Sequence, residues 1–238
     1  MMERSLDSLR ENIKIIQDRV AEAAFQSGRN YKDITILAAT KMVAPQILQS
    51  AIDFGIKCVG ESRVQELLQK YVYFKEKECQ IHFIGHLQRN KVKHLIGKVD
   101  MIQSVDRLLL AQEISRLSVI KKAVTEVLIE VNIGKEGSKS GVDVENLEEL
   151  LYEISELPGI KIRGLMAIPP VCEDKKLKEN YFLLMKRLFV DLSAKNIYNN
   201  IMDYLSMGMS SDYYEAILHG ANMVRVGSAI FGKRNYGV

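Results

Sequence analysis

Short apolar runs and helical stretches alternate along almost the whole chain. Before the first run, apolar residues recur at steps of three and four, which predicts a helix with one apolar face. These residues are Leu6, Leu9, Ile13, Ile16, Val20 and Ala23. Gly28 follows as a stop signal, so an N-terminal helix is predicted within residues 1–28.

Eight short runs follow, several of them continuously apolar and rich in Ile, Val and Leu. That composition is typical of parallel strands that are buried on both faces. The runs span residues 34–40, 57–60, 81–85, 101–105, 127–133, 162–168, 204–208 and 223–230. Stretches with apolar spacing near 3.6 residues lie between them and predict helices. These stretches are 44–55, 63–74, 108–117, 146–157 and 181–192.

Eight strands with helices between them predict an α/β fold, a closed (β/α)₈ TIM barrel with an extra N-terminal helix. An open doubly wound sheet is the alternative, but it usually has fewer strands and exposes two edges. The length of 238 residues suits one barrel, which typically needs roughly 250. Because no Pro-, Gly- or Ser-rich linker divides the chain, residues 1–238 are expected to form a single domain, with the helix of residues 1–28 packed on the barrel.

The composition argues against several classes of protein. The net charge of +3 is mild, whereas nucleic-acid binders usually carry a concentrated basic face, so we expect no nucleic-acid partner. Cys58, Cys79 and Cys172 are odd in number and widely spaced, which favours neither a zinc site nor a disulfide framework. The N-terminus lacks the apolar core of a signal peptide, and no apolar run is long enough for a membrane span. We therefore expect a cytoplasmic protein without a membrane partner.

The first strand ends in Ala38-Ala39-Thr40-Lys41. Working residues of such barrels lie at the C-terminal ends of strands, where Lys41 would point into the barrel mouth. A lysine amine in such a place is the nucleophile that forms imines with carbonyl groups. From position alone, the ordinary alternative is a lysine that extends its ammonium group into water.

The ends of strands seven and eight favour the nucleophilic role of Lys41 over the solvent-exposed one. After strand seven, Ser210, Ser211 and Asp212 precede a helix, and all three are residue types that cap helices. Strand eight ends in Gly227 and Ser228, followed by a short helical turn. Phosphate sites of such barrels are often built from these two loops and a helix N-terminus. With Lys41 on the neighbouring strand, this pattern predicts a site for a phosphorylated carbonyl compound.

Other candidate motifs carry less weight. His82 and His86 have the spacing of a helical zinc pair, but Gly85 interrupts any helix there and no third ligand follows. The glycine-rich loop 134–141 lacks the spacing of a P-loop. The basic stretch 86–94 has no interleaved aromatic residues, so it is expected to be a solvated helix start.

Several of these segments together resemble the pyridoxal phosphate homeostasis proteins, which are barrel-only relatives of the alanine racemase N-terminal domain. The segments, in chain order, are AATK (38–41), GESRVQE (60–66), HFIGHLQRNK (82–91), SKSG (138–141), GLMAI (164–168), LSMGMSSD (205–212) and MVRVGSAIFG (223–232). They cover nearly the whole chain in the family's order, which makes the resemblance specific.

The resemblance implies pyridoxal 5′-phosphate (PLP) as cofactor and assigns its binding residues. Lys41 would form the covalent imine with PLP. Ser210, Gly227 and Ser228 would hold the phosphate, with Met209 in the same motif, and Arg225 would face the pyridine nitrogen. The family usually has asparagine where this chain has Ser62, so a contact of Ser62 with the cofactor would be shorter or mediated by water.

The implied function is to hold PLP and take part in vitamin B6 and amino-acid homeostasis, more a carrier or regulator than an enzyme. Arg225 cannot accept a proton, so it would leave the pyridine nitrogen unprotonated and the ring a weaker electron sink. PLP-dependent apoenzymes are candidate partners, and a monomer is expected. Alternatives are a PLP-dependent racemase or lyase, and a cofactor-free lysine aldolase. Racemisation needs a second base, which related racemases take from an added domain; Tyr204 and Tyr236 are the candidates in this chain.

Overall fold

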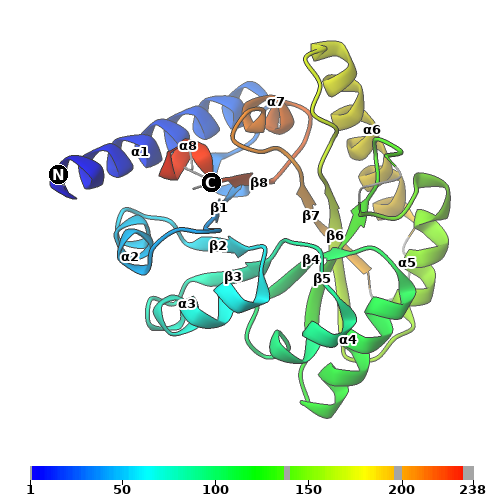
Figure 1. Cartoon of the computed structure of the whole chain (residues 1–238). Helices are drawn as coiled ribbons and strands as arrows, with labels where there is room; N and C mark the ends of the chain where they lie inside the picture. The colour runs from blue at the N-terminus through cyan, green and yellow to red at the C-terminus, as the bar shows by residue number, and fades with distance from the viewer. Residues whose placement is uncertain (1, 137–139, 196–199, 233–238) are drawn as a thin grey trace.

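Eight parallel strands close into a barrel in this protein. The computed structural model describes residues 2–136, 140–195 and 200–232. Strands pair in chain order from β1 to β8, and β8 pairs with β1, so the sheet has no free edge (Figure 1). The predicted (β/α)₈ barrel is confirmed, and the open sheet that was its alternative is wrong.

Each predicted run overlaps one strand. The strands are β1 (Thr35–Ala39), β2 (Cys58–Glu61), β3 (Gln80–Phe83), β4 (Met101–Val105), β5 (Thr125–Val131), β6 (Ile160–Ala167), β7 (Asn200–Ser206) and β8 (Met223–Val226). The last run, 223–230, contains more than a strand. It leaves the sheet after Val226 and continues as the short helix α8 (Ser228–Phe231).

The five helices predicted between strands are present. They are α2 (Pro45–Asp53), α3 (Val64–Glu76), α4 (Leu108–Ile120), α5 (Leu147–Ser155) and α6 (Lys175–Ala194), and α7 (Tyr213–Leu218) follows β7. Short 3₁₀ helices occur at η1 (Tyr31–Asp33), η2 (Arg89–His94) and η3 (Val144–Asn146). The helix start expected in 86–94 is therefore the 3₁₀ helix η2. Its sequence buries only Val92, which is too little for an apolar helical face.

Both faces of the strands are buried, as their composition predicts. The outer faces join the apolar sides of the helices in one continuous core. Inside the barrel, two small apolar clusters fill the space. One consists of Leu37, Cys58 and Met223, and the other of Met101, Leu128 and Met166. Polar side chains occupy the interior on the side of the strands' C-terminal ends, where the site lies.

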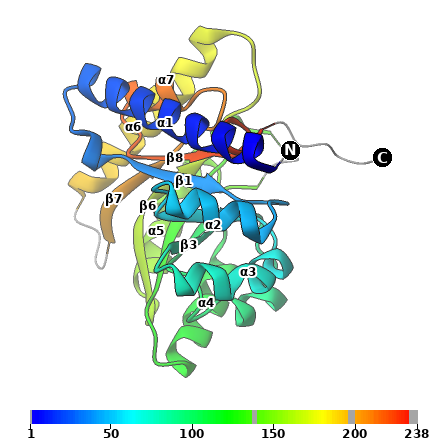
Figure 2. The ribbon, with the colours of Figure 1, turned by 90° about the vertical axis from the view of Figure 1, so that its left-hand side faces the viewer.

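The expected extra helix is α1 (Met2–Gln26), which contacts α7, α8 and α2 (Figures 1 and 2). Its apolar stripe, which includes Ile13, Ile16 and Val20, is buried. Asn12 Nδ2 donates a hydrogen bond of 3.0 Å to the carbonyl oxygen of Ile230 in α8. Because α8 has only four residues, α1 supplies the apolar cover that a full eighth helix would provide.

Candidate functional site

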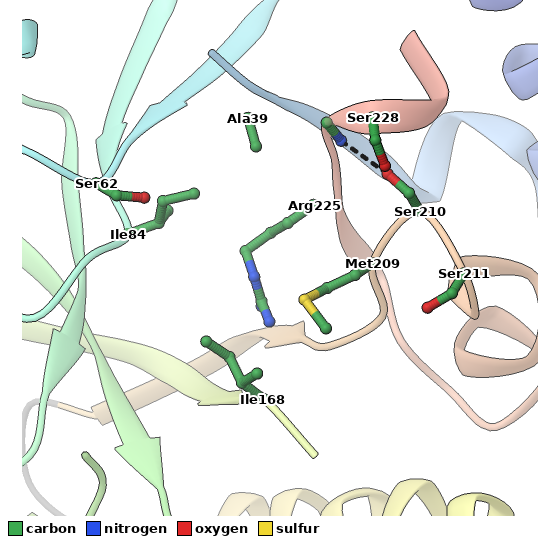
Figure 3. A pocket seen from close by; sticks show the side chains of 10 residues that line it. Ala39, Ser62, Ile84, Ile168, Met209, Ser210, Ser211, Arg225 and Ser228 are labelled. Atoms are coloured by element: carbon green, nitrogen blue, oxygen red, sulfur yellow. Dashed lines mark hydrogen bonds between the residues drawn. The ribbon is translucent and has the colours of Figure 1, made fainter. Parts of the chain in front are cut away.

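A cavity of about 620 Å³ opens at the C-terminal ends of the strands. Its lining comes from the ends of β1, β2, β3, β6, β7 and β8 (Figure 3). The lining residues are Ala39, Ser62, Ile84, Ile168, Met209, Ser210, Ser211, Arg225, Gly227 and Ser228. Figure 3 shows Ser62 and Ile84 on one side, Ser210 and Ser228 on the other, and the Arg225 side chain between them.

The structure brings most of the predicted cofactor-binding residues together. Ser62, Met209, Ser210, Arg225, Gly227 and Ser228 all line this one cavity, although they come from three separate segments of the chain. Lys41 is not among the lining residues. It lies in a turn two residues beyond β1 and is half-buried. Along β1, Leu37 packs inside the barrel and Ala39 lines the cavity, and Lys41 follows in a turn in which the Val43 amide donates to the Thr40 carbonyl oxygen at 3.0 Å.

A buried ionic cluster, which we call the Lys41 clamp, fixes the backbone on both sides of Lys41. The Thr40 hydroxyl donates to Glu61 Oε1 at 2.6 Å, and Lys70 Nζ donates to the Thr40 carbonyl oxygen at 2.8 Å. Lys70 Nζ also lies 2.8 Å from Glu61 Oε1 and 3.4 Å from Glu66 Oε2. The amide of Met42, which has a φ of 60°, donates to Glu66 Oε2 at 2.7 Å.

Burial dominates the electrostatics of the clamp. Glu61 is fully buried and Lys70 is 6% exposed. Burial raises the pKa of the Glu61 carboxyl, and the hydrogen bonds from Lys70 and Thr40 offset only part of that effect. A charge pair this deep is costly to separate, so the turn that carries Lys41 is held in one conformation.

The loops after β7 and β8 meet through the Ser210 hydroxyl. Gly208, at a φ of 92°, turns the chain out of β7, and an added Cβ there would lie 2.6 Å from the Cβ of Ala216. Ser210 Oγ then accepts a hydrogen bond from the Gly227 amide at 3.0 Å (Figure 3). It also accepts one from the Ala229 amide at 3.2 Å. Two amides at the start of α8 thus converge on one oxygen atom at the cavity wall.

Arg225 is buried and held by two partners. Its Nη1 donates to Ser206 Oγ at 2.6 Å, and its Nη2 donates to the carbonyl oxygen of Ala167 at 2.8 Å. Burial lowers its pKa to about 10, against the opposing effect of Glu130 and Asp212. Arg225 therefore stays cationic at neutral pH.

Behind Arg225, a chain of hydrogen bonds crosses the barrel interior. The Ser206 hydroxyl donates to Gln103 Oε1 at 2.8 Å, and Gln103 Nε2 lies 2.8 Å from His82 Nδ1. An amide nitrogen can only donate, so His82 Nδ1 is the acceptor and its ring proton is on Nε2. Burial lowers the pKa of His82 to about 4, which keeps the ring neutral at pH 7.

Sequence reasoning missed the clamp and this interior chain as parts of the site. Glu66 and Lys70 are four residues apart on one helix, a spacing typical of ion pairs. Gln103 is polar within an otherwise apolar strand, which is a sign of an interior hydrogen bond. Which strands supply their partners depends on barrel closure, and no local spacing reveals that.

Some predicted features do not contribute to the cavity. Tyr204 packs against the interior apolar clusters and lies under the Arg163 guanidinium at 5.5 Å, away from the cavity lining. Tyr236 lies outside the described residues, as do Ser138 and Lys139 of the SKSG motif. His86 lies in a loop beyond β3 with Nδ1 2.9 Å from Ser140 Oγ, whereas His82 is inside the barrel. Within the part of the chain that the structure describes, no His, Cys, Asp and Glu group could hold a metal ion.

The family match of this barrel places it among domains of the alanine racemase type. Residues 5–235 match the family described as alanine racemase, N-terminal domain. The pyridoxal phosphate homeostasis protein of Aquifex aeolicus is 42% identical over 226 residues, which cover 95% of this chain and 98% of that protein. The chain belongs to this alanine racemase N-terminal family, and within it to the pyridoxal phosphate homeostasis proteins.

Solved structures agree with this placement. A protein of unknown function from Bifidobacterium adolescentis superposes with a TM-score of 0.90 at 32% identity, covering 96% of both chains. PipY from Synechococcus elongatus, solved with PLP bound, has a TM-score of 0.78 at 28% identity and covers 90% of this chain and all of its own, 100%. In the described residues, no helix has the length and apolar character needed to span a membrane.

We predict that Lys70→Met destabilises the fold by about 3–5 kcal/mol at neutral pH, because it leaves the buried Glu61 carboxylate without its partner. Urea unfolding measures the loss, with Lys75→Met on the exposed side of α3 as the matched control. Adding Glu61→Gln should recover much of the loss. Equal stability of the Lys70→Met and Lys75→Met variants would show that the clamp contributes nothing.

Because the His82 ring is buried and neutral, we predict that the protein loses folding stability in acid. Its folded pKa is depressed to about 4, so its neutral form contributes stability that is lost as the pH falls from about 6.5 toward 4. The wild type should lose about 2–3 kcal/mol more than His82→Gln between pH 7 and pH 4.5. Unfolding curves at both pH values test this, with the exposed His86→Gln as control. Parallel losses in all three proteins would contradict a buried neutral His82.

Proposed function

We propose that this protein holds PLP in the strand-end cavity as an imine of Lys41 and serves vitamin B6 and amino-acid homeostasis as a carrier. The observation that carries the proposal is the pair of amides that converge on Ser210 Oγ, across the cavity from a fixed arginine. PLP is bound in the PipY structure, and the Aquifex aeolicus relative is named for PLP homeostasis.

The residues present fit the phosphate of PLP. The amides of Gly227 and Ala229 already donate to an oxygen atom, which is the geometry that a phosphate oxygen needs. The Ser210 hydroxyl accepts from both amides, so its own hydrogen is available to donate to phosphate. Ser228 is exposed at the same wall and adds a second hydroxyl.

The residues also fit the ring and the aldehyde. Arg225 presents a permanent cation that cannot accept a proton, which suits an unprotonated pyridine nitrogen. Lys41 follows the cavity residue Ala39 by two positions, and the clamp holds the backbone on both sides of it. Ser62, in place of the family's asparagine, leaves more room at the edge of the cavity.

When bound, PLP supplies an electrophilic aldehyde and an electron-withdrawing ring. In this protein Lys41 provides the amine, the Ser210 loop anchors the phosphate, and Arg225 keeps the ring a weak electron sink. Those roles are enough to retain PLP. A racemase also needs a second base opposite Lys41, and Tyr204 lies away from the cavity.

The proposed carrier works in the cytoplasm as a monomer and passes PLP to apoenzymes. All three cysteines are free, and Cys58 and Cys79 are buried among apolar residues, which suits a reducing compartment. Burial raises the pKa of the Cys79 thiol to about 12, so that thiol is unreactive.

We predict that adding PLP to the purified protein produces a visible absorption band that Lys41→Ala abolishes. The band requires a covalent imine, and Lys41 is the amine that this proposal assigns to it. Absorbance titration measures it, with Lys32→Ala on the exposed η1 segment as the control. A band of full intensity in Lys41→Ala would transfer the imine to another lysine.

The phosphate site predicts selective losses. Ser210→Ala and Ser228→Ala should each weaken PLP binding by about tenfold or more, because hydrogen bonds to a charged group contribute roughly 1.5–3 kcal/mol. Fluorescence titration with PLP and with pyridoxal gives the comparison, and the exposed Ser193→Ala serves as control. Pyridoxal should bind far more weakly than PLP, and equal affinity for the two would refute the phosphate site.

A carrier and a racemase differ in the formation of the second enantiomer. With PLP and L-alanine in deuterated water, we expect negligible D-alanine, since lacking a positioned base on the second face of the α-carbon typically costs roughly 10²–10⁴ in rate. Proton NMR together with chiral chromatography measures both exchange and D-alanine. Rapid exchange with D-alanine formation would show that the protein is an enzyme.

A further inference from the structure

The cavity at the barrel mouth continues into a second lobe. This amine lobe, as we name it, has a volume of about 390 Å³ and shares Ser62, Ile84 and Ile168 with the cavity that holds Ser210 and Arg225. Its remaining lining residues are Gly85, His86, Glu130, Asn132 and Ser140. A molecule in the lobe would therefore lie directly beside whatever occupies the cavity.

Glu130 is the acidic residue of the lobe, and its burial is not explained by any hydrogen bond to its carboxylate among the described residues. It lies near the end of β5, two residues after Leu128, which packs inside the barrel, and its side chain lines the lobe. It is only 7% exposed, yet within the described residues no hydrogen bond reaches its carboxylate. Its backbone is fixed, because its carbonyl oxygen accepts from the Val142 amide at 2.8 Å. A largely buried carboxylate that faces a cavity is suited to accept a hydrogen bond from a ligand there.

The surroundings of Glu130 favour a cation. Burial raises the pKa of Glu130 to about 7; Asp106 adds to the rise, and Arg225 opposes it. Asp106 is bound by Arg107 at 2.5 Å, and Arg225 is engaged by Ser206 and Ala167. His86 Nδ1 lies 4.0 Å from Asp106 Oδ2 and is half exposed.

The described lining residues of the lobe include no permanent cation that would hold an anion. The Asn132 side chain is occupied on both sides, since its amide nitrogen donates to the Glu136 carbonyl oxygen and its oxygen accepts from the Glu136 amide. Among the described lining residues, only His86 could become cationic, and it already contacts Ser140. An α-carboxylate in the lobe would lie beside Glu130, and Arg225, the cation among the described residues that acts on Glu130, is already engaged by Ser206 and Ala167.

From this arrangement, and on the premise that Lys41 holds PLP as proposed above, we infer that the lobe admits a primary alkylamine without an α-carboxylate, and that Glu130 takes the proton from its ammonium group. The amine thereby becomes a nucleophile beside the imine carbon and can displace Lys41.

The exchange balances in atoms and charge. Glu130 accepts one proton from the alkylammonium ion, and the neutral nitrogen forms a bond to the imine carbon. The bond from that carbon to Lys41 Nζ then breaks, and the proton held by Glu130 is returned to the departing Lys41 amine. No oxidant or reductant is required, and PLP leaves Lys41 attached to the incoming amine. Release of PLP then depends on a cationic amine in the lobe.

The ligand preference of the lobe can be tested without PLP. In the PLP-free protein with ¹³C-labelled glutamate carboxyl groups, the Glu130 signal is assigned by its absence in Glu130→Gln and titrated by NMR. Propylammonium chloride should move its midpoint to lower pH than sodium chloride at equal ionic strength, because a bound cation favours the carboxylate. L-2-aminobutyrate, which is propylamine with an α-carboxylate, should not. The same midpoint in all three salts would overturn the inference, and so would a shift with aminobutyrate alone.

The proton transfer is tested on the loaded protein. Propylamine should displace Lys41 about 100-fold more slowly in Glu130→Gln than in the wild type, as expected for a lost general base. The control Glu153→Gln, at an exposed position of α5, should exchange at the wild-type rate. Stopped-flow absorbance at several pH values measures the rates. Above pH 7 burial disfavours the carboxylate, so Glu130→Gln should fold at least as stably, and its unchanged absorption band before mixing confirms this. Equal rates in the wild type and in Glu130→Gln would show that Glu130 takes no part in the proton transfer. A protein that shows no band with PLP would refute the proposed function instead, and the NMR titration would still decide what the lobe binds.

Discussion

Closing eight parallel strands into a barrel imposes one constraint on everything else: each inward-facing polar side chain must find its partner inside the barrel. Part of the interior is filled by apolar side chains such as Met101 and Met166, which need no hydrogen-bond partner. Toward the mouth, a directed chain of hydrogen bonds runs from Arg225 through Ser206 and Gln103 to a neutral His82. That chain holds a permanent cation in the cavity through neutral partners. A cation held in this way suits an unprotonated ring nitrogen and does not give it a proton.

The same closure separates the two attachments of the proposed cofactor and gives each its own support. On the β1 side, the clamp of Glu61, Glu66 and Lys70 lies outside the barrel and fixes the turn around Lys41. On the β7–β8 side, Ser210 links two loops by accepting from two amides. The Lys41 end thus depends on buried charges and the phosphate end on backbone donors. Between them, Glu130 is a buried carboxylate with no partner among the described residues, and it gives the cavity an acidic side.

Local pattern predicted the fold well because each strand and helix carries its own periodicity. The eight apolar runs match the eight strands, and strand-end position gathered Ser210, Gly227 and Ser228 at one mouth, whereas Ser62 and Arg225 were assigned from the family resemblance. What sequence could not give were pairings across the barrel. Gln103 in β4 accepts from Ser206 in β7, three strands away, so this pair depends on closure and register. The 3₁₀ helix η2 was also missed in type, since its polar sequence forms a helical turn without an apolar face.

The central claim is that Lys41 and the Ser210–Gly227 loops serve one ligand. Borohydride reduction of the PLP-loaded protein, followed by digestion and peptide mass mapping, tests it most directly, because reduction makes the imine bond permanent at the lysine that forms it. The account predicts one pyridoxyl-phosphate group per chain, on the peptide that contains Lys41. A modification mapped to another lysine such as Lys70, or spread over many surface lysines with Lys41 unmodified, would contradict it.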